Sequence, residues 1–322
     1  MPDLGTIAVI QRHAGERTQA AGLSLALEQM HFVGAETVSA GPFPATLRRA
    51  LETAVELGAD WTVMLDADVL LFPSALPKLI RLAADHPSAT ASVAACCLDR
   101  FSGTVRLVGV RCYRTQAIGP ALDLNGWEDA IRPETRLLQL LTERGFPTYL
   151  TAQLVGIHGF EQFYRDLYRT AVVHGVKHRS KATSFIERSA STPTDDAETQ
   201  VIMAGLREGL TRKHVNLDAE PLHHKALSTL RRLGLVERPP LLAVESDEII
   251  KRLDARHRWL TRPSNVARLF PGFSRRMSHK EGQPRVARTA RLAWKYRAHL
   301  LDPAPVNPIL RFRAPRSETS RQ

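Results

Sequence analysis

Apolar runs separated by amphipathic stretches organise the first part of the chain. Continuous apolar runs at residues 6–10 and 61–70 predict buried strands. Between and after these runs, apolar residues recur at helical spacing over 18–29, 44–57 and 74–84. Strands that alternate with helices at these lengths predict an α/β domain with a mostly parallel sheet.

Beyond residue 89 the apolar runs become shorter and more closely spaced. They predict, in chain order, strands at 90–98, 105–110 and 112–113, a helix at 133–144, and extended segments at 146–150 and 153–157. Residues 160–250 show mostly helical patterns. We therefore divide the chain into a domain over residues 1–165, a helical extension over 166–255 and a partly disordered tail over 256–322.

The net charge of +11 is concentrated in the tail. Residues 256–322 contain 16 Lys and Arg against 3 Asp and Glu, which leaves 28 basic and 30 acidic residues in the first 255. A nearly neutral body argues against nucleic-acid binding by the main domain. Within the tail, the basic segment 285–301 carries Trp294 and Tyr296. It predicts either peripheral contact with an anionic membrane surface or a solvated helix packed on the domain.

Cysteine usage and the lack of a long apolar run indicate in which cellular compartment the protein resides. Cys96, Cys97 and Cys112 show no CxxC spacing, and their odd number predicts buried free thiols instead of disulfides or a zinc site. No apolar run approaches the roughly 18 residues that cross a bilayer. The N-terminus has no signal-peptide pattern. We expect a cytoplasmic protein that could also sit peripherally on the inner face of the cell membrane.

The tripeptide Asp66-Ala67-Asp68 is the strongest chemical signal in the sequence. Two carboxylates interrupt an apolar stretch between Gly58 and Pro73. A buried carboxylate is costly unless it is paired or bound to a cation, so this pattern predicts a divalent metal site. The alternative is a turn in which Asp68 accepts hydrogen bonds from nearby backbone N–H groups.

The order of a first strand, a helix with basic residues and a strand that ends in Asp-x-Asp resembles the GT-A glycosyltransferase fold. Within it, the resemblance is to family 2-like bacterial enzymes, over roughly residues 5–160. It implies a Rossmann-like three-layer domain, followed here by a helical C-terminal region. It also implies that Asp66 and Asp68 hold Mn²⁺ or Mg²⁺ against the diphosphate of a UDP- or GDP-linked sugar. His158, after an extended run, matches the third metal ligand.

The same resemblance implies further donor contacts. Gln11, Arg12 and Arg17 lie at the end of the first strand and in the loop after it, where the family contacts the nucleotide. Arg48, on the following helix, faces either the diphosphate or solvent. For each of these side chains, a solvated polar surface is the alternative interpretation.

The segment 133–146 resembles the helix that carries the catalytic base. Glu134 matches the acidic position that deprotonates the acceptor hydroxyl, although Pro133 replaces the acid that precedes it in the family. Asp129 is a rival base. One base opposite the leaving group implies single displacement with inversion. The expected acceptor is a glycan or a lipid-linked sugar.

Three other hypotheses remain open from the sequence. The first is a haloacid-dehalogenase-like Mg²⁺-dependent phosphatase, with Asp66 as nucleophile and Asp68 as acid/base. Its further residues would be Lys177 or Lys181 and the pair Asp195-Asp196. The second is a GT-A-like pseudoenzyme, suggested by Pro133. The third is a tail that binds nucleic acid as an accessory property.

Overall fold

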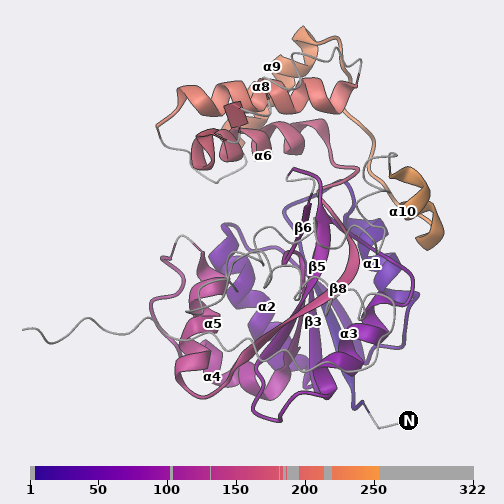
Figure 1. The fold of residues 1–322 in the computed structure, drawn as a ribbon, viewed down its shortest axis with the longest axis vertical. Helices are drawn as coiled ribbons and strands as arrows, with labels where there is room; N and C mark the ends of the chain where they lie inside the picture. Colours follow the sequence, from indigo (N-terminus) through magenta and orange to yellow (C-terminus); the bar gives the residue numbers. More distant parts are fainter. Residues whose placement is uncertain are drawn as a thin grey trace, which may run out of the picture.

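The computed structural model describes residues 4–101, 104–130, 132–180, 182–183, 186, 196–213 and 220–253. The basic tail, including the segment 285–301, lies outside the described residues, and so does the predicted domain boundary at 256. The described chain forms an α/β domain with a group of helices above it (Figure 1).

An eight-stranded sheet forms the middle layer, in the order β2-β1-β3-β7-β5-β8-β4, with β6 paired to β5. The strands are β1 (Ile7–Arg12), β2 (Gly34–Val38), β3 (Trp61–Asp66), β4 (Val69–Leu71), β5 (Ser92–Asp99), β6 (Thr104–Arg106), β7 (Val110–Arg114) and β8 (Thr148–His158). Strand β1 is parallel to β2 and β3, and β5 is parallel to β8, while the remaining pairs are antiparallel. Strands β2, β1, β3, β5 and β8 therefore all point the same way, which confirms the predicted mostly parallel sheet.

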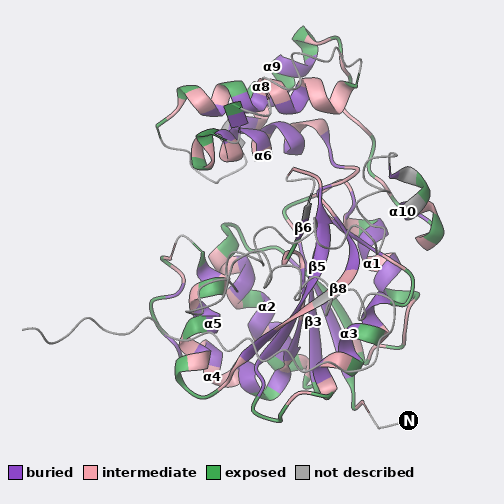
Figure 2. Cartoon of the chain, in the orientation of Figure 1, coloured by how far each residue is buried: buried purple, intermediate pink, exposed green. Residues whose placement is uncertain are grey.

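Helices cover both faces of the sheet. One face carries α1 (Gln19–Leu27), α3 (Ala75–Ala84) and α10 (Ser246–Arg252), and the other carries α2 (Phe43–Leu57), α4 (Ile118–Leu122) and α5 (Pro133–Glu143). Each face has its own buried cluster, with Leu25 and Leu79 in one and Leu51 and Trp127 in the other. The strands between them are buried along most of their length (Figure 2). The three-layer prediction is confirmed.

The predicted strand at 61–70 is wrong in one respect, because the chain turns at the Asp-Ala-Asp tripeptide. Strand β3 ends at Asp66, and β4 begins at Val69 and pairs with β8 at the far end of the sheet. The turn is held by the Ala67 N–H, which donates to the Arg12 carbonyl at 2.9 Å, and by the Gly159 N–H, which donates to the Asp68 carbonyl at 2.9 Å. Turning here takes both carboxylates out of the apolar core, where their charge would be costly.

The two extended segments predicted at 146–150 and 153–157 form one strand, β8. It remains paired with β5 along its length through register shifts between Ala94 and Cys97. The irregular register lets the two residues between the predicted segments, Thr151 and Ala152, stay within the strand. The three cysteines are free and buried, as predicted.

Three of the described helices pack into a separate group with its own apolar core. These are α6 (Tyr164–Lys177), α8 (Ala197–Thr211) and α9 (Glu220–Arg232), and the core includes Val172, Ile202 and Leu206. Helix α6 follows β8 directly, so the group lies above the carboxyl edge of the sheet (Figure 1). Helices α6 and α8 pack so closely that a Cβ on Gly209 would lie 2.3 Å from the Val172 carbonyl oxygen. Only glycine allows this approach.

Polar contacts fix the helical group to the domain. The Arg100 guanidinium, just after β5, forms an ion pair with Glu198 of α8 at 3.0 Å. Glu198 also pairs with Arg238 at 2.6 Å, in the segment that returns from α9 to the domain. Among the described helices, none is both long enough and apolar enough to cross a bilayer.

Candidate active site

The carboxyl ends of the parallel strands bring four functional side chains to one edge of the sheet. Arg12, Asp66, Asp99 and His158 are the last residues of β1, β3, β5 and β8. Helices α1 and α2 cover opposite faces, so the chain reverses its direction of winding between β1 and β3. In open α/β sheets the crevice outside such a reversal is the usual ligand site.

The first cluster at this edge is centred on Arg12. Its side chain is 5% exposed and binds Asp66 Oδ1 through Nη2 at 2.6 Å and Nε at 2.9 Å. Its Nη1 also donates to Glu134 Oε1 at 3.2 Å. Glu134, in the first turn of α5, accepts a further hydrogen bond from the Tyr113 hydroxyl at 2.9 Å, and Arg111 Nε lies 3.6 Å away. One buried cation thus joins the Asp-x-Asp tripeptide to the predicted base.

The two carboxylates of this cluster respond differently to burial. Burial raises the pKa of Asp66 and, together with Asp68 and Glu134, outweighs the opposing charge of Arg12. Burial also acts to raise the pKa of Glu134, but Arg12, Arg111 and the Tyr113 hydrogen bond prevail and lower it. Glu134 is therefore ionised at neutral pH.

The second cluster is a chain of three side chains that ends in a buried carboxylate. Asp68 Oδ2 lies 3.3 Å from His158 Nε2, and His158 Nδ1 lies 3.0 Å from Asp99 Oδ1. Asp99 is 3% exposed and also forms an ion pair with Arg106 of β6 at 3.2 Å. Burial alone would lower the pKa of His158, but the carboxylates of Asp68 and Asp99 raise it to about 9.

This second cluster fits a divalent cation. An imidazole that bonds to a carboxylate through one nitrogen and presents the other nitrogen outward is the usual form of a metal-binding histidine. Here Asp99 fixes the ring so that Nε2 faces Asp68. Asp66 does not join them, because Arg12 holds it, and no group of three His, Cys, Asp or Glu side chains in the described ranges is arranged for a metal. Mg²⁺-type ions commonly take only one or two protein ligands and complete their shell with phosphate and water.

Two of the predicted nucleotide contacts lie away from these clusters. Gln11 is fully buried beneath α1, and its amide donates to the Gln19 carbonyl at 2.8 Å. Arg17 bonds to the Glu161 carboxylate at 2.9 Å and to the Pro239 carbonyl at 2.7 Å. It thereby ties the loop after β1 to the segment that follows α9.

Arg48 and Asp129 also lie apart from both clusters. Arg48, on α2, bonds to Glu128 through Nε at 2.8 Å, and its guanidinium lies 5.3 Å from the Trp127 ring centroid. This contact fixes the loop between α4 and α5. Asp129, in the same loop, is exposed.

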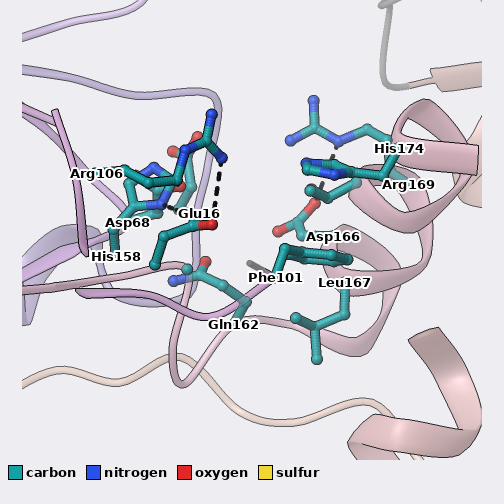
Figure 3. A pocket seen from close by; sticks show the side chains of 13 residues that line it. Glu16, Asp68, Phe101, Arg106, His158, Gln162, Asp166, Leu167, Arg169 and His174 are labelled. Atoms are coloured by element: carbon teal, nitrogen blue, oxygen red, sulfur yellow. Dashed lines mark hydrogen bonds and ion pairs between the residues drawn. The ribbon is translucent and has the colours of Figure 1, made fainter. Parts of the chain in front are cut away.

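A pocket of about 90 Å³ lies between the sheet edge and α6, and sequence analysis missed most of its lining (Figure 3). Asp68, His158, Glu16 and Arg106 line one side. The missed residues of the other side are Phe101, Asp166, Leu167, Arg169 and His174. Asp99 was within reach of the sequence, since it is a carboxylate directly after a predicted strand. The residues of α6 carried no signal, because only the tertiary fold brings them to this edge.

No protein-family profile and no curated protein matches this sequence. Among solved structures, a mannosyltransferase from Pyrobaculum calidifontis in complex with GDP-Man and Mn²⁺ is 13% identical, with 87% of this chain and 90% of that chain covered and a TM-score of 0.36. A glycosyltransferase involved in glycosylation of the major capsid of PBCV-1 is 14% identical, covering 46% and 82%, with a TM-score of 0.33.

A 4-diphosphocytidyl-2C-methyl-D-erythritol synthase from Anaerococcus prevotii is 9% identical, covering 47% of this chain and 90% of that chain, with a TM-score of 0.35.

The pocket histidine His174 makes stability depend on pH. Burial lowers the pKa of His174 to about 4, whereas the unfolded chain binds its proton near pH 6.5. The unfolded state therefore binds more protons between these values, so stability is full above pH 6.5 and falls as the pH drops toward 4. We expect the burial of His174 to lower the free energy of unfolding by about 2 kcal/mol when the pH falls from about 7.5 to about 5.

Urea denaturation at both pH values measures this effect. The His174→Gln variant should lose less stability on acidification than the wild type by that amount. His31→Gln, at an exposed position, is the matched control and should behave as the wild type. Equal acid sensitivity of His174→Gln and wild type would contradict the assignment.

Proposed function

We propose that this protein is a metal-dependent glycosyltransferase that moves a sugar from a UDP- or GDP-linked donor to a hydroxyl of a glycan or lipid-linked acceptor, with inversion. The observation that carries the proposal is the Asp68–His158–Asp99 chain at the carboxyl edge of the sheet, beside the crevice at β1 and β3. It supplies two outward-facing metal ligands where a nucleotide diphosphate would lie.

Asp68 and His158 would hold Mn²⁺ or Mg²⁺, which when bound neutralises charge on a departing nucleoside diphosphate. Asp99 acts through His158, since its bond to Nδ1 fixes the ring and leaves Nε2 facing Asp68. Arg106 in turn holds Asp99 from the other side. With only two protein ligands, the site would leave several positions of the ion for donor oxygens.

Arg12 is the positioning residue of the first cluster. Its guanidinium is occupied by Asp66 and Glu134 and is almost fully buried. We assign it the role of holding these two carboxylates in place at the floor of the donor crevice. Gln11 and Arg17 would then support the loop after β1, and Arg48 the loop before α5, instead of contacting the donor directly.

Glu134 is our proposed base for the acceptor hydroxyl. Its contacts with Arg12, Arg111 and Tyr113 all use Oε1, so Oε2 is the oxygen directed to a substrate. The lowered pKa keeps the carboxylate ionised throughout the neutral range, which is the form that a base requires. Asp129 remains the alternative base, and its exposed position makes it a useful comparison.

The phosphatase alternative has less support. A phosphorylated Asp66 would have to lose its two bonds with Arg12. Asp196 caps the N-terminus of α8, where its side chain accepts from the N–H groups of Glu198 and Thr199, so it does not stand at a strand end. Lys177 lies in the last turn of α6, while Lys181 and Asp195 are outside the described residues.

Contact of the basic tail with a membrane remains a prediction from the sequence.

Asp68→Asn should weaken metal-dependent nucleotide binding. In calorimetric titrations of UDP and GDP with Mn²⁺, the wild type should bind one nucleotide, which selects the donor class. The variant should bind it at least about tenfold more weakly, because an amide is a poorer ligand for a hard cation. Asp129→Asn is the control and should bind like the wild type. Nucleotide binding that is unaffected by Asp68→Asn, or absent from the wild type, would contradict the proposal.

Glu134→Gln should reduce turnover while leaving nucleotide binding intact. Turnover is measured as release of nucleotide from the selected donor, with water as acceptor. Loss of the base should lower the rate about 10²- to 10⁴-fold. Asp129→Asn should have little effect. A larger loss in Asp129→Asn than in Glu134→Gln would transfer the role to Asp129, and a wild type with no turnover would support the pseudoenzyme hypothesis.

A further inference from the structure

Helix α6 carries an incompletely bonded polar cluster around Asp166. This residue lies in the first turn of α6 and is 8% exposed. Its nearest cationic partners stand beyond hydrogen-bond distance, with His223 Nε2 at 3.6 Å and Arg169 Nε at 4.0 Å from Oδ1. Arg165 is close enough for its charge to act on the Asp166 carboxyl as well. The carboxylate is thus surrounded by donors that do not reach it.

The donors themselves are left without partners. Arg165 Nε, Arg169 Nε and His223 Nε2 are buried and make no hydrogen bond to any described residue. A buried N–H group without a partner costs about 1–3 kcal/mol. Two of these nitrogens, Arg169 Nε and His223 Nε2, lie beside the Asp166 carboxylate, which indicates that an oxygen-bearing molecule completes the cluster.

The cluster opens onto the pocket that holds the proposed metal ligands. Figure 3 shows Asp166 and Arg169 on the helix side, facing Asp68 and His158 across the pocket. Phe101 and Leu167 add an apolar surface on the same side as Asp166. A carboxylate beside a guanidinium offers an acceptor and a donor together, which suits hydroxyl groups because each hydroxyl both donates and accepts.

The charge nearest to the ligand on the helix side favours a neutral sugar over an anionic ligand. Asp166 faces the pocket there, and its carboxylate would repel an anion placed against it. Hydroxyl groups carry no such cost, and the C–H face of a sugar ring can pack on Phe101 and Leu167.

We propose that Asp166 and Arg169 form the acceptor subsite, in which they bind hydroxyl groups of a neutral sugar ring. The assignment rests on the proposed function, because the donor diphosphate then occupies the Asp68–His158 side and leaves the α6 side to the acceptor. Helix α6 would thus select the acceptor. The two glycine contacts that bring α6 and α8 together, at Gly175 and Gly209, hold this wall in place.

The test uses methyl pyranosides as probes on the full chain. Binding of methyl glucoside, galactoside, mannoside and N-acetylglucosaminide is measured by saturation-transfer NMR, with and without Mg²⁺ and nucleotide. The wild type should bind at least one of them at millimolar concentration. Asp166→Asn and Arg169→Gln should each weaken that binding about 10- to 100-fold, the range for a hydrogen bond to a charged group. Arg207→Gln, on α8 and facing a separate groove, is the matched control.

Deoxy analogues of the bound sugar identify the hydroxyl concerned. Removing the hydroxyl that Asp166 binds should weaken binding to the wild type but should cause no further loss in Asp166→Asn. Nucleotide binding should be the same in all these variants, so failure of the donor site, seen with Asp68→Asn, is distinguishable from failure of this subsite.

Three results would overturn the proposal. One is that no methyl pyranoside binds the wild type. Another is that Asp166→Asn and Arg169→Gln bind the sugar as the wild type does, which would leave an ordered water as the molecule that completes the cluster. The third is that both variants lose nucleotide binding, which would place the residues on the donor side.

Discussion

Two carboxylates at the end of a buried strand must each find a positive partner, and the structure gives them different ones. Asp66 is paired with the almost fully buried Arg12, while Asp68 faces His158. Removing one member of a buried ion pair typically costs about 3–5 kcal/mol, because the remaining charge stays buried. The Arg12 pair is therefore a fixed part of the fold. Asp68 is the carboxylate left for a ligand.

The different partners of Asp66 and Asp68 set the arrangement of the rest of the site. Because Arg12 also binds Glu134, the proposed base is held at a set position relative to the Asp-Ala-Asp turn. On the other side, Asp99 fixes His158, and Arg106 fixes Asp99. Two networks, from the β1/β3 and the β5/β8 strand ends, thus meet at Asp66-Ala67-Asp68. The helical group closes the same edge from above and is held there by the ion pairs of Glu198 (Figure 1).

Local sequence patterns were sufficient to predict the layers of the fold and the strand ends at which the functional side chains lie. Apolar runs located β1, β3 and β5, and helical periodicity located α2 and α3, because these elements are amphipathic or buried in the way their residues require. The break at Asp66 was missed, since a run of apolar residues on both sides does not reveal that β4 pairs at the far edge of the sheet. Arg12 was expected at the nucleotide, and its pairing with Glu134, 122 residues away, is set by tertiary structure alone. For the same reason the wall formed by α6 was not foreseen.

In the proposed site, His158 and Asp68 share a divalent ion with the donor diphosphate. Pulsed electron paramagnetic resonance of Mn²⁺, bound to the protein with UDP or GDP, detects such sharing. We predict hyperfine coupling of Mn²⁺ to both an imidazole nitrogen and phosphorus, with the nitrogen coupling lost in His158→Gln and retained in His174→Gln. Mn²⁺ bound with the nucleotide but without nitrogen coupling, or nitrogen coupling that persists in His158→Gln, would contradict the account.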